Sequence, residues 1–286
     1  MALLVEVSEL GALPEPVLFV DARVLADYEQ GHIPGAIHHD TFEFANEETD
    51  GENLDLVVDA WRQMFCSVGI TLEGSVVFYD VGTENRAARP AFMLHHMGHP
   101  HSHVLHGGMT AWLESGGAVS TEQTVRPAVS WEVPVHDRRH GIVIGIDEVS
   151  SRLGRDDVVF LDVRDEPEYE GVRKMQDNPR LGRIPGAVSF EWAHFLRRRD
   201  EFPPEAGTPR GETFVLDRLR PAEDLRLELA KAGVESADTE VVIYCQKSHR
   251  ASLVYVVFDA LGYRNGHVYA GSFREWSRRE DLPVEL

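Results

Sequence analysis

The chain carries, at residues 241–252, the stretch VVIYCQKSHRAS, which joins two apolar runs through one of the two cysteines. The short run at 241–243 is typical of a buried strand, and the longer run from Ala251 to Leu261 is typical of a helix. Cys245 therefore stands where a strand ends and a helix begins. The N–H groups of such a turn and the positive end of the helix converge on the cysteine sulfur, and they stabilise a thiolate.

The residues after Cys245 are mostly polar or charged, which favours a reactive cysteine over an apolar core residue. Lys247, Arg250 and His249 are candidate cations for the thiolate. For Gln246 and Ser248, an ordinary loop role agrees with the sequence as well as a specific one does. The candidate substrate-binding and loop residues are Gln246, Lys247, Ser248, His249 and Arg250.

An internal repeat organises the chain, because five blocks of its first half recur in the same order in its second half. The fourth block places Asp80 of the first copy at the position of Cys245 in the second. We therefore expect two copies of one fold side by side, with the nucleophile in the second. The paired blocks are 18–23 with 159–164, 27–28 with 168–169, 31–37 with 182–188, 76–80 with 241–245, and 103–108 with 267–272.

Each copy alternates short apolar runs with segments of helical periodicity, such as 55–68 and 221–232. This alternation predicts an α/β fold in which each copy is an open, mainly parallel sheet flanked by helices. Ligands of such sheets bind beyond the carboxyl ends of the strands, where Cys245 falls. Composition places a first domain at 1–124, a linker at 125–142 and a second domain at 143–286.

The composition limits the classes of molecule that this protein is expected to bind. The net charge of −20 over 286 residues argues against nucleic acid and against anionic membranes, since both require a basic surface. No run approaches the roughly 18 apolar residues that span a bilayer, and residues 1–13 lack the features of a signal peptide. Two cysteines make no disulfide framework, so a reducing, cytoplasmic compartment is expected. A small anionic substrate would need a locally positive site within this acidic protein.

The tandem α/β repeat, the Asp-x-Arg block, the His-Ile-Pro-Gly-Ala block and the cysteine loop together resemble two-domain sulfurtransferases of the rhodanese family. The resemblance covers nearly the whole chain. It implies a catalytic C-terminal domain with Cys245 as the catalytic residue, and a related N-terminal domain that is catalytically silent. Asp80 in place of the cysteine agrees with a silent first copy.

The activity implied by this resemblance is the transfer of a sulfane sulfur from a small anionic donor, thiosulfate, through a persulfide on Cys245. The acceptor would be cyanide in an assay, and a thiol or another protein in the cell. No metal and no cofactor is required. The alternatives are a mercaptopyruvate sulfurtransferase and a non-enzymatic persulfide-sensing or docking protein. A phosphatase ranks lower, because the loop from Cys245 to Arg250 has six residues and related phosphatases have seven.

The identity of the donor rests on fewer residues. The cations Lys247 and Arg250 suit the dianion thiosulfate. However, Glu168 stands where thiosulfate-using members of the family carry a substrate arginine. The loop is similar to the bacterial Cys-Gln-x-x-His-Arg form, whose members share the triplet Phe-Glu-Trp found here at 190–192. Trp192 could therefore form a wall of the pocket, or it could serve ordinary packing between the domains.

Other conspicuous residues have structural interpretations. Arg23 and Arg164 follow strand-end aspartates in both copies, so we expect them to pair with nearby carboxylates. Cys66 is expected to be buried and inert. The acidic stretch 43–55 is expected to be a solvated loop. We also expect a monomer, because the two repeats can bury their faces against each other. A cluster of histidines suggests a metal site by composition alone, but it aligns with an ordinary segment of the second copy: His95, His96, His99, His101, His103 and His106.

Overall fold

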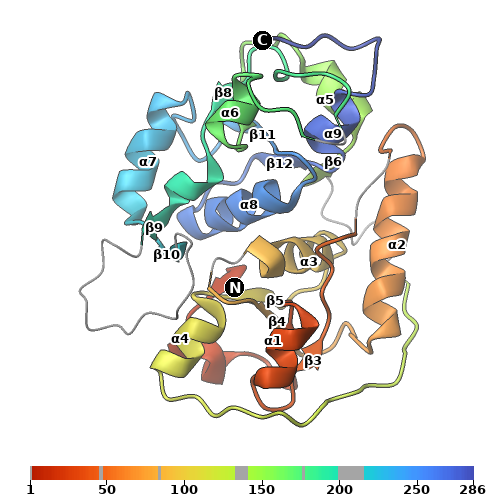
Figure 1. Ribbon diagram of the computed structural model, residues 1–286, viewed down its shortest axis with the longest axis vertical. Coiled ribbons are helices and arrows are strands. Elements are labelled where there is room, and N and C mark those ends of the chain that lie inside the picture. Colours follow the sequence, from red (N-terminus) through yellow and green to blue (C-terminus); the bar gives the residue numbers. More distant parts are fainter. Residues whose placement is uncertain (1, 45–47, 83–84, 133–140, 176–177, 199–215) are drawn as a thin grey trace.

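A computed structural model describes residues 2–44, 48–82, 85–132, 141–175, 178–198 and 216–286. Its two halves are two α/β units, each with a five-stranded parallel sheet (Figure 1). The strand orders are β1-β5-β4-β2-β3 and β6-β12-β11-β7-β8, which are equivalent element by element. The fold class expected from the sequence is confirmed. Among the described residues, no helix has the length and apolar character needed to cross a bilayer.

The first unit contains both the expected strands and the expected long helix. The helix predicted at 55–68 is α2, which begins two residues earlier. The elements of this unit are β1 (Leu4–Val5), η1 (Val7–Ala12), β2 (Val17–Asp21), α1 (Leu25–Gln30), β3 (Ile37–His38), α2 (Asn53–Ser67), β4 (Ser75–Tyr79), α3 (Asn85–His96), β5 (Ser102–Leu105) and α4 (Gly108–Glu114).

The second unit repeats this order and adds a small antiparallel pair, β9 with β10, outside the main sheet. The helix predicted at 221–232 is α7. The elements are β6 (Val143–Ile144), α5 (Ile146–Arg152), β7 (Val158–Asp162), α6 (Glu166–Tyr169), β8 (Val188–Ser189), η3 (Trp192–Phe195), β9 (Leu196–Arg198), β10 (Leu216–Leu219), α7 (Ala222–Lys231), β11 (Glu240–Tyr244), α8 (His249–Leu261), β12 (Gly266–Tyr269) and α9 (Ser272–Trp276).

The alternation of side chains along β11 decides where the cysteine points. Val242 and Tyr244 pack in a core on the outer face of the sheet, beside α5 and α9. Val241 and Ile243 face the other way, into a core that both units share. Successive side chains of a strand point to opposite faces, so Cys245 continues the row of Val241 and Ile243. It belongs to the shared core and lies on the side facing the first unit.

The two units meet along α3 and α8, which lie side by side in the middle of the molecule (Figure 1). Phe92 of α3 packs on Tyr255 of α8 with ring centroids 4.7 Å apart. The largest apolar cluster contains buried residues of both units, so their interface is a continuous part of the core. Burial of this surface holds the units together, since apolar area contributes about 25 cal/mol per Å². A site at the start of α8 is therefore built against the first unit.

Residues 40–50 of the first unit, which we call the strap, contact the second unit at Phe42 and Thr49. Residues 45–47 of the strap lie outside the described residues. Thr49 is 2% exposed, and its N–H and hydroxyl donate to the two carboxylate oxygens of Glu275, both at 2.6 Å. Burial raises the pKa of Glu275 although these hydrogen bonds oppose the rise. The expectation of a solvated loop is therefore wrong at Thr49, because a buried carboxylate of the other unit draws it in.

The strand-end arginines occupy matching positions in the two units. Arg23 Nη2 lies 2.6 Å from Asp21 Oδ2 and donates to the carbonyl of Gly31 at 2.7 Å. Arg164 Nη2 lies 2.6 Å from Asp162 Oδ2 and donates to the carbonyl of the corresponding glycine at 2.8 Å. Both arginines are buried. The same ion pair in both units supports the structural interpretation of these residues.

Candidate active site

Cys245 directly follows β11, which lies between β12 and β7 in the second sheet. It is therefore at the carboxyl end of an inner parallel strand, where open α/β sheets bind ligands. α8 begins four residues later, at His249, and the first N–H groups of a helix have no partner within it. The amino end of α8 is thus adjacent to the cysteine. Cys245 is 1% exposed, so other side chains cover it closely.

Ser272, the first residue of α9, supports the cysteine loop through hydrogen bonds to its backbone. Its Oγ accepts the N–H of Cys245 at 3.3 Å and the N–H of Ser248 at 3.1 Å, and it donates to the carbonyl of Tyr269 at 2.9 Å. Ser248 and Ser272 have φ angles of 62° and 54°, a left-handed conformation that residues other than glycine rarely adopt. Such strained residues cluster at functional sites. A second element, α9, therefore supports the shape of the loop.

Sequence reasoning missed Ser272, although the repeat contained a signal. The matching residue of the first unit is Gly108, which also has a positive φ, of 49°. Glycine at one copy of a repeated position indicates a backbone conformation that other residues avoid. A serine that accepts this strain in the other copy is a candidate for a special role.

Arg250 is paired with carboxylates of the protein. Its Nη1 donates to Asp165 Oδ1 at 2.9 Å and to Glu168 Oε2 at 2.8 Å, and its Nη2 donates to Glu168 Oε1 at 3.3 Å. Burial alone would lower the pKa of Arg250, but the charges of Cys245 and Glu168 hold it above its usual value. Arg250 is therefore a cation near the cysteine whose charge two carboxylates largely balance. That it also binds the donor stays a prediction.

His249 is not one of the cations around the cysteine. Burial and, after it, the neighbouring charge of Arg89 lower its pKa to about 2. Its ring packs against Phe42 of the strap, with centroids 4.5 Å apart. Its Nε2 lies 3.2 Å from Arg89 Nη1, which can only donate, so Nε2 is the unprotonated acceptor. The sequence could not show this neutral state, because the burial and the arginine come from the first unit.

The remaining loop residues have different surroundings. Gln246 is buried and exchanges two hydrogen bonds with the side chain of Asn178, at 3.0 Å and 2.5 Å. This pairing turns the glutamine side chain to a neighbouring segment and supports the loop. Lys247 is half-buried, and its charge contributes to the low pKa of His249. The structure therefore brings all five predicted loop residues to one place, but it gives them different chemical environments.

Arg89 of α3 reaches the same site from the first unit, and sequence reasoning did not identify it. It is 1% exposed. Its Nη1 donates to the carbonyl of Phe44 at 2.5 Å and to His249 at 3.2 Å, and its guanidinium lies 5.0 Å from the ring centre of Trp61. Its Nε and Nη2 have no hydrogen-bond partner in the described part of the chain. Burial lowers the pKa of Arg89 to about 10, and the charge of Cys245 opposes this shift.

The matching loop of the first unit holds a carboxylate. Asp80 is buried, and its Oδ1 accepts the N–H of Gly82 at 2.8 Å while its Oδ2 accepts the N–H of Arg86 at 3.0 Å. The N–H of Met109 donates to the Asp80 carbonyl at 2.8 Å, as the N–H of the corresponding residue, Phe273, donates to the carbonyl of the cysteine at 2.9 Å. The first loop therefore shows that backbone amides of this turn bind an anion at the strand end.

Two further predictions concern Trp192 and the histidine cluster of the first unit. Trp192 is half-buried at the start of η3 and packs against the shared core, so its role as a pocket wall stays a prediction. The histidines near β5 are engaged individually: His99 with the carbonyl of Thr71, His103 with that of Ala2, and His106 with Glu6. Among the described residues, no three His, Cys, Asp or Glu side chains form a group that could hold a metal ion.

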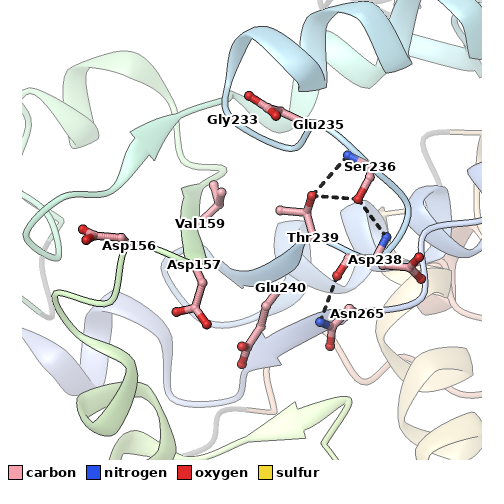
Figure 2. Close-up of a pocket in the computed structure, with 10 residues that line it drawn as sticks. All are labelled: Asp156, Asp157, Val159, Gly233, Glu235, Ser236, Asp238, Thr239, Glu240 and Asn265. Atoms are coloured by element: carbon pink, nitrogen blue, oxygen red, sulfur yellow. Dashed lines mark hydrogen bonds between the residues drawn. The ribbon is translucent and has the colours of Figure 1, made fainter.

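A pocket of about 540 Å³ lies at the opposite edge of the second sheet, next to the first residues of β7 and β11 (Figure 2). Its acidic side chains are drawn in Figure 2: Asp156, Asp157, Glu235, Asp238 and Glu240. Arg152 and Arg155 pair with Glu240 at 2.7 Å and 3.1 Å. The pocket is separated from Cys245 by the full length of β11, and its charge disfavours an anionic substrate.

Together, the fold and the site define a tandem α/β protein with a cysteine loop in one unit and a carboxylate loop in the other. The family model of the Rhodanese-like domain matches residues 6–115 and again 146–279. The thiosulfate sulfurtransferase of Azotobacter vinelandii is 32% identical over 100% of this chain and 98% of its own length. The chain therefore belongs to the rhodanese-like sulfurtransferase family and contains two copies of its domain.

Two other relatives extend this comparison. A crystal structure of a probable thiosulfate sulfurtransferase superposes with a TM-score of 0.70 at 26% identity, covering 96% of this chain and 99% of that one. The 3-mercaptopyruvate sulfurtransferase of Escherichia coli is 24% identical over 93% of this chain and 87% of its own length. The relatives thus include enzymes named for two different sulfur donors.

Proposed function

We propose that this protein transfers the sulfane sulfur of thiosulfate to a nucleophilic acceptor through a persulfide on Cys245. The observation that carries the proposal is the pair of equivalent loops. Backbone amides of the first loop bind the Asp80 carboxylate, and the second loop offers the same position to a cysteine sulfur. A turn that binds an anion favours a thiolate, which is the reactive form of cysteine. Similarity to thiosulfate sulfurtransferases supports the choice of donor.

The reaction is a double displacement in which atoms and electrons balance. The Cys245 thiolate attacks the outer sulfur of thiosulfate, and a new S–S bond forms as the bond to the sulfonate sulfur breaks. The electron pair of the broken bond leaves with sulfite, and the persulfide anion remains on the enzyme. A nucleophile such as cyanide then attacks the terminal sulfur, thiocyanate departs, and the Cys245 thiolate is restored. The loop amides stabilise the negative sulfur in both steps.

The acceptor in the cell would be a thiol or another protein, for which cyanide substitutes in an assay. Both half-reactions use only the cysteine and the two substrates, so the proposed chemistry requires no metal and no organic cofactor. A phosphatase is disfavoured because the cysteine loop, from Cys245 to Arg250, spans six residues. Its arginine is also already bound to Asp165 and Glu168 rather than free to receive a phosphate.

The decisive experiment measures thiocyanate formation by the purified protein from thiosulfate and cyanide. We expect turnover by the wild type, none by Cys245→Ser, and unchanged turnover by Cys66→Ser, which replaces the other buried cysteine. Mass spectrometry after thiosulfate treatment should show one added sulfur on the peptide that contains Cys245. Turnover that survives Cys245→Ser would refute the mechanism. Persulfide formation without transfer to any acceptor would favour the persulfide-sensing or docking alternative.

Access to the sulfur supplies a second test, because Cys245 is 1% exposed. The proposal requires that small reagents enter the site in the native protein. We therefore expect iodoacetamide to alkylate Cys245 under native conditions, and thiosulfate to slow this reaction. A sulfur that becomes reactive only after denaturation would rule out the proposed role.

A second donor, mercaptopyruvate, is favoured by one observation. Glu168 stands at the position expected of a donor-binding arginine and instead pairs with Arg250, which reduces the positive charge offered to a dianion. Mercaptopyruvate carries a single carboxylate, and a relative named for that donor matches most of this chain. The ratio of kcat/KM for thiosulfate to that for mercaptopyruvate decides between them. A ratio well below one would replace the proposed donor while leaving the persulfide mechanism in place.

A further inference from the structure

Arg89 is a buried cation, and the described residues use only part of its hydrogen-bonding capacity. An arginine side chain carries five N–H donors, and Nη1 uses its two on the Phe44 carbonyl and His249 Nε2. Nε and Nη2, which carry the other three, have no partner in the described part of the chain, and the residue is 1% exposed. Leaving buried charged donors unpaired is costly, so such a group in a native structure calls for a partner that arrives later.

The position of the guanidinium is fixed by the contacts that it does make. The strap supplies the Phe44 carbonyl, α8 supplies His249, and the Trp61 ring lies 5.0 Å from the guanidinium carbon. The Phe44 carbonyl and His249 occupy Nη1, and the rings of Trp61 and Phe44 lie 5.0 Å and 5.9 Å from the guanidinium carbon. The Nε hydrogen and one Nη2 hydrogen lie along one edge of the guanidinium, and such an edge forms parallel hydrogen bonds with two oxygens of one oxyanion.

The surroundings of Arg89 show which charge it faces. His249, its neighbour, lies at the start of α8, four residues after Cys245, and is neutral. The negative charge that favours protonated Arg89 is that of Cys245. The loop arginine, Arg250, is meanwhile balanced by two carboxylates. Arg89 is therefore a buried cation that contacts the first residue of α8 and has no carboxylate partner among the described residues.

We propose that Arg89, contributed by the unit without the cysteine, binds the sulfonate end of the sulfur donor through its Nε and Nη2 hydrogens. This inference rests on the proposed function and assigns the oxyanion end of the donor to a residue of the first unit. Arg89 neutralises the departing sulfite when the bond to the sulfane sulfur breaks. The first unit is then part of the active site, and it supplies the local positive charge that an anionic donor needs in a protein of net charge −20.

A pair of donors that differ in charge tests this assignment in the full-length protein. Methanethiosulfonate has a methyl group in place of one sulfonate oxygen of thiosulfate, so its leaving group carries one negative charge fewer. We expect Arg89→Met, which keeps much of the side-chain stem, to lower kcat/KM for thiosulfate by about 10- to 100-fold, as expected for loss of hydrogen bonds to a charged group. The loss with methanethiosulfonate should be distinctly smaller. Arg89→Lys should fall between the wild type and Arg89→Met with thiosulfate.

Arg86→Met is the matched control. Arg86 lies one turn before Arg89 on α3, contacts the ring of Phe42 in the strap, and already pairs with Asp40 at 2.9 Å. Its loss should leave the preference between the two donors unchanged. A second measurement needs no turnover: the rate of Cys245 alkylation by iodoacetate, an anion, relative to that by neutral iodoacetamide. Arg89→Met should lower this ratio several-fold, and Arg86→Met should not.

The outcomes separate the two proposals. An active wild type for which Arg89→Met and Arg89→Lys reduce both donors equally, with an unchanged alkylation ratio, would show a structural role and overturn the assignment of Arg89. A wild type that transfers sulfur from neither donor would instead refute the proposed function, whatever the alkylation ratio. If Arg89→Met does not fold, Arg89→Lys decides the question, because it retains the charge. Its kcat/KM is then compared between thiosulfate and methanethiosulfonate in the same way.

Discussion

The two loops at the ends of β4 and β11 occupy the same place in the two units but hold different groups. In the first loop, Asp80 fills the position with its own carboxylate, which accepts two backbone N–H groups. In the second loop, Cys245 takes that position, and Ser272 holds the loop by two of its N–H groups. The comparison shows the same strand-to-helix turn in both units, and in the first unit its amides bind a carboxylate. The two turns differ in the residue that follows the strand, which is Asp80 in the first unit and Cys245 in the second.

The two loops also differ in the partners of their arginines and in what the other unit contributes to them. The loop arginine of the first unit, Arg86, pairs with the exposed Asp40, whereas that of the second, Arg250, pairs with the buried Glu168. The first unit also contributes Arg89 and the strap to the candidate site in the other unit. The first unit thus contains a turn that its own carboxylate occupies, while residues of its α3 and of the strap contact the first residue of α8 in the second unit.

The largest expected effect comes from making the second loop like the first. Cys245→Asp places a carboxylate in the turn, where Asp80 shows that the amides accept one. The folded structure should survive, but sulfur transfer should be lost completely because no nucleophilic sulfur remains. Thiocyanate assays and thermal unfolding check both expectations. Residual turnover above the uncatalysed rate would show that the transferred sulfur is carried elsewhere.

The next effect concerns the residue that supports the cysteine loop. Ser272→Gly reproduces the Gly108 of the first unit and removes the acceptor for two buried N–H groups. Because an orphaned buried donor costs about 1–3 kcal/mol, we expect kcat to fall by roughly 10- to 100-fold with little change in KM. Ser272→Ala should be worse, since alanine keeps the strain at positive φ.

Ser277→Ala is the control for this variant, since Ser277 is also buried just after α9 but donates to the carbonyl of Arg274 rather than to the cysteine loop. Its kinetics should match those of the wild type. A Ser272→Gly enzyme with an unchanged kcat would show that the loop keeps its shape without the serine hydroxyl.

A smaller effect is expected when the first loop loses its anion. Asp80→Ala leaves the N–H groups of Gly82 and Arg86 without their acceptor, as in the loss of a helix cap. We expect the free energy of unfolding to drop by about 1–2 kcal/mol while the cysteine chemistry continues. Urea denaturation and thiocyanate assays measure the two properties. Asp40→Ala, which removes an exposed ion pair of the same unit, should change stability by less than about 1 kcal/mol.

The smallest effect is expected from a change at Glu168, the buried partner of Arg250. Glu168→Gln keeps the shape of the side chain but removes a negative charge that faces Arg250. Arg250 then offers more of its charge to the donor, so kcat/KM for thiosulfate should rise a few-fold, mainly through a lower KM. Glu166→Gln, on the exposed side of α6, should have no effect. A lower kcat/KM in Glu168→Gln would mean that Glu168 is needed to position Arg250.

Much of the fold and part of the site could be predicted from the chain alone. The repeat, the parallel sheets and the placement of Cys245 at a strand-to-helix turn follow from hydrophobic periodicity and from the order of the blocks, and the structure contains them. Arg89 could not be predicted, because it precedes its partner His249 by 160 residues and nothing in its local sequence marks it as buried. Thr49 was misjudged for the same reason, since Glu275 binds it from the other unit.

The sequence by itself determined the features that depend on near neighbours along the chain: the strand, the turn, the helix start and the choice of cysteine or aspartate at the turn. Tertiary structure alone decided the features that depend on distance through space. It buried His249 and made it neutral, balanced Arg250 with Glu168, and brought Arg89 to the site with no carboxylate partner among the described residues. The physical reason is that charge state and pairing depend on desolvation and on nearby charges, and here both arise where two units separated in sequence pack together.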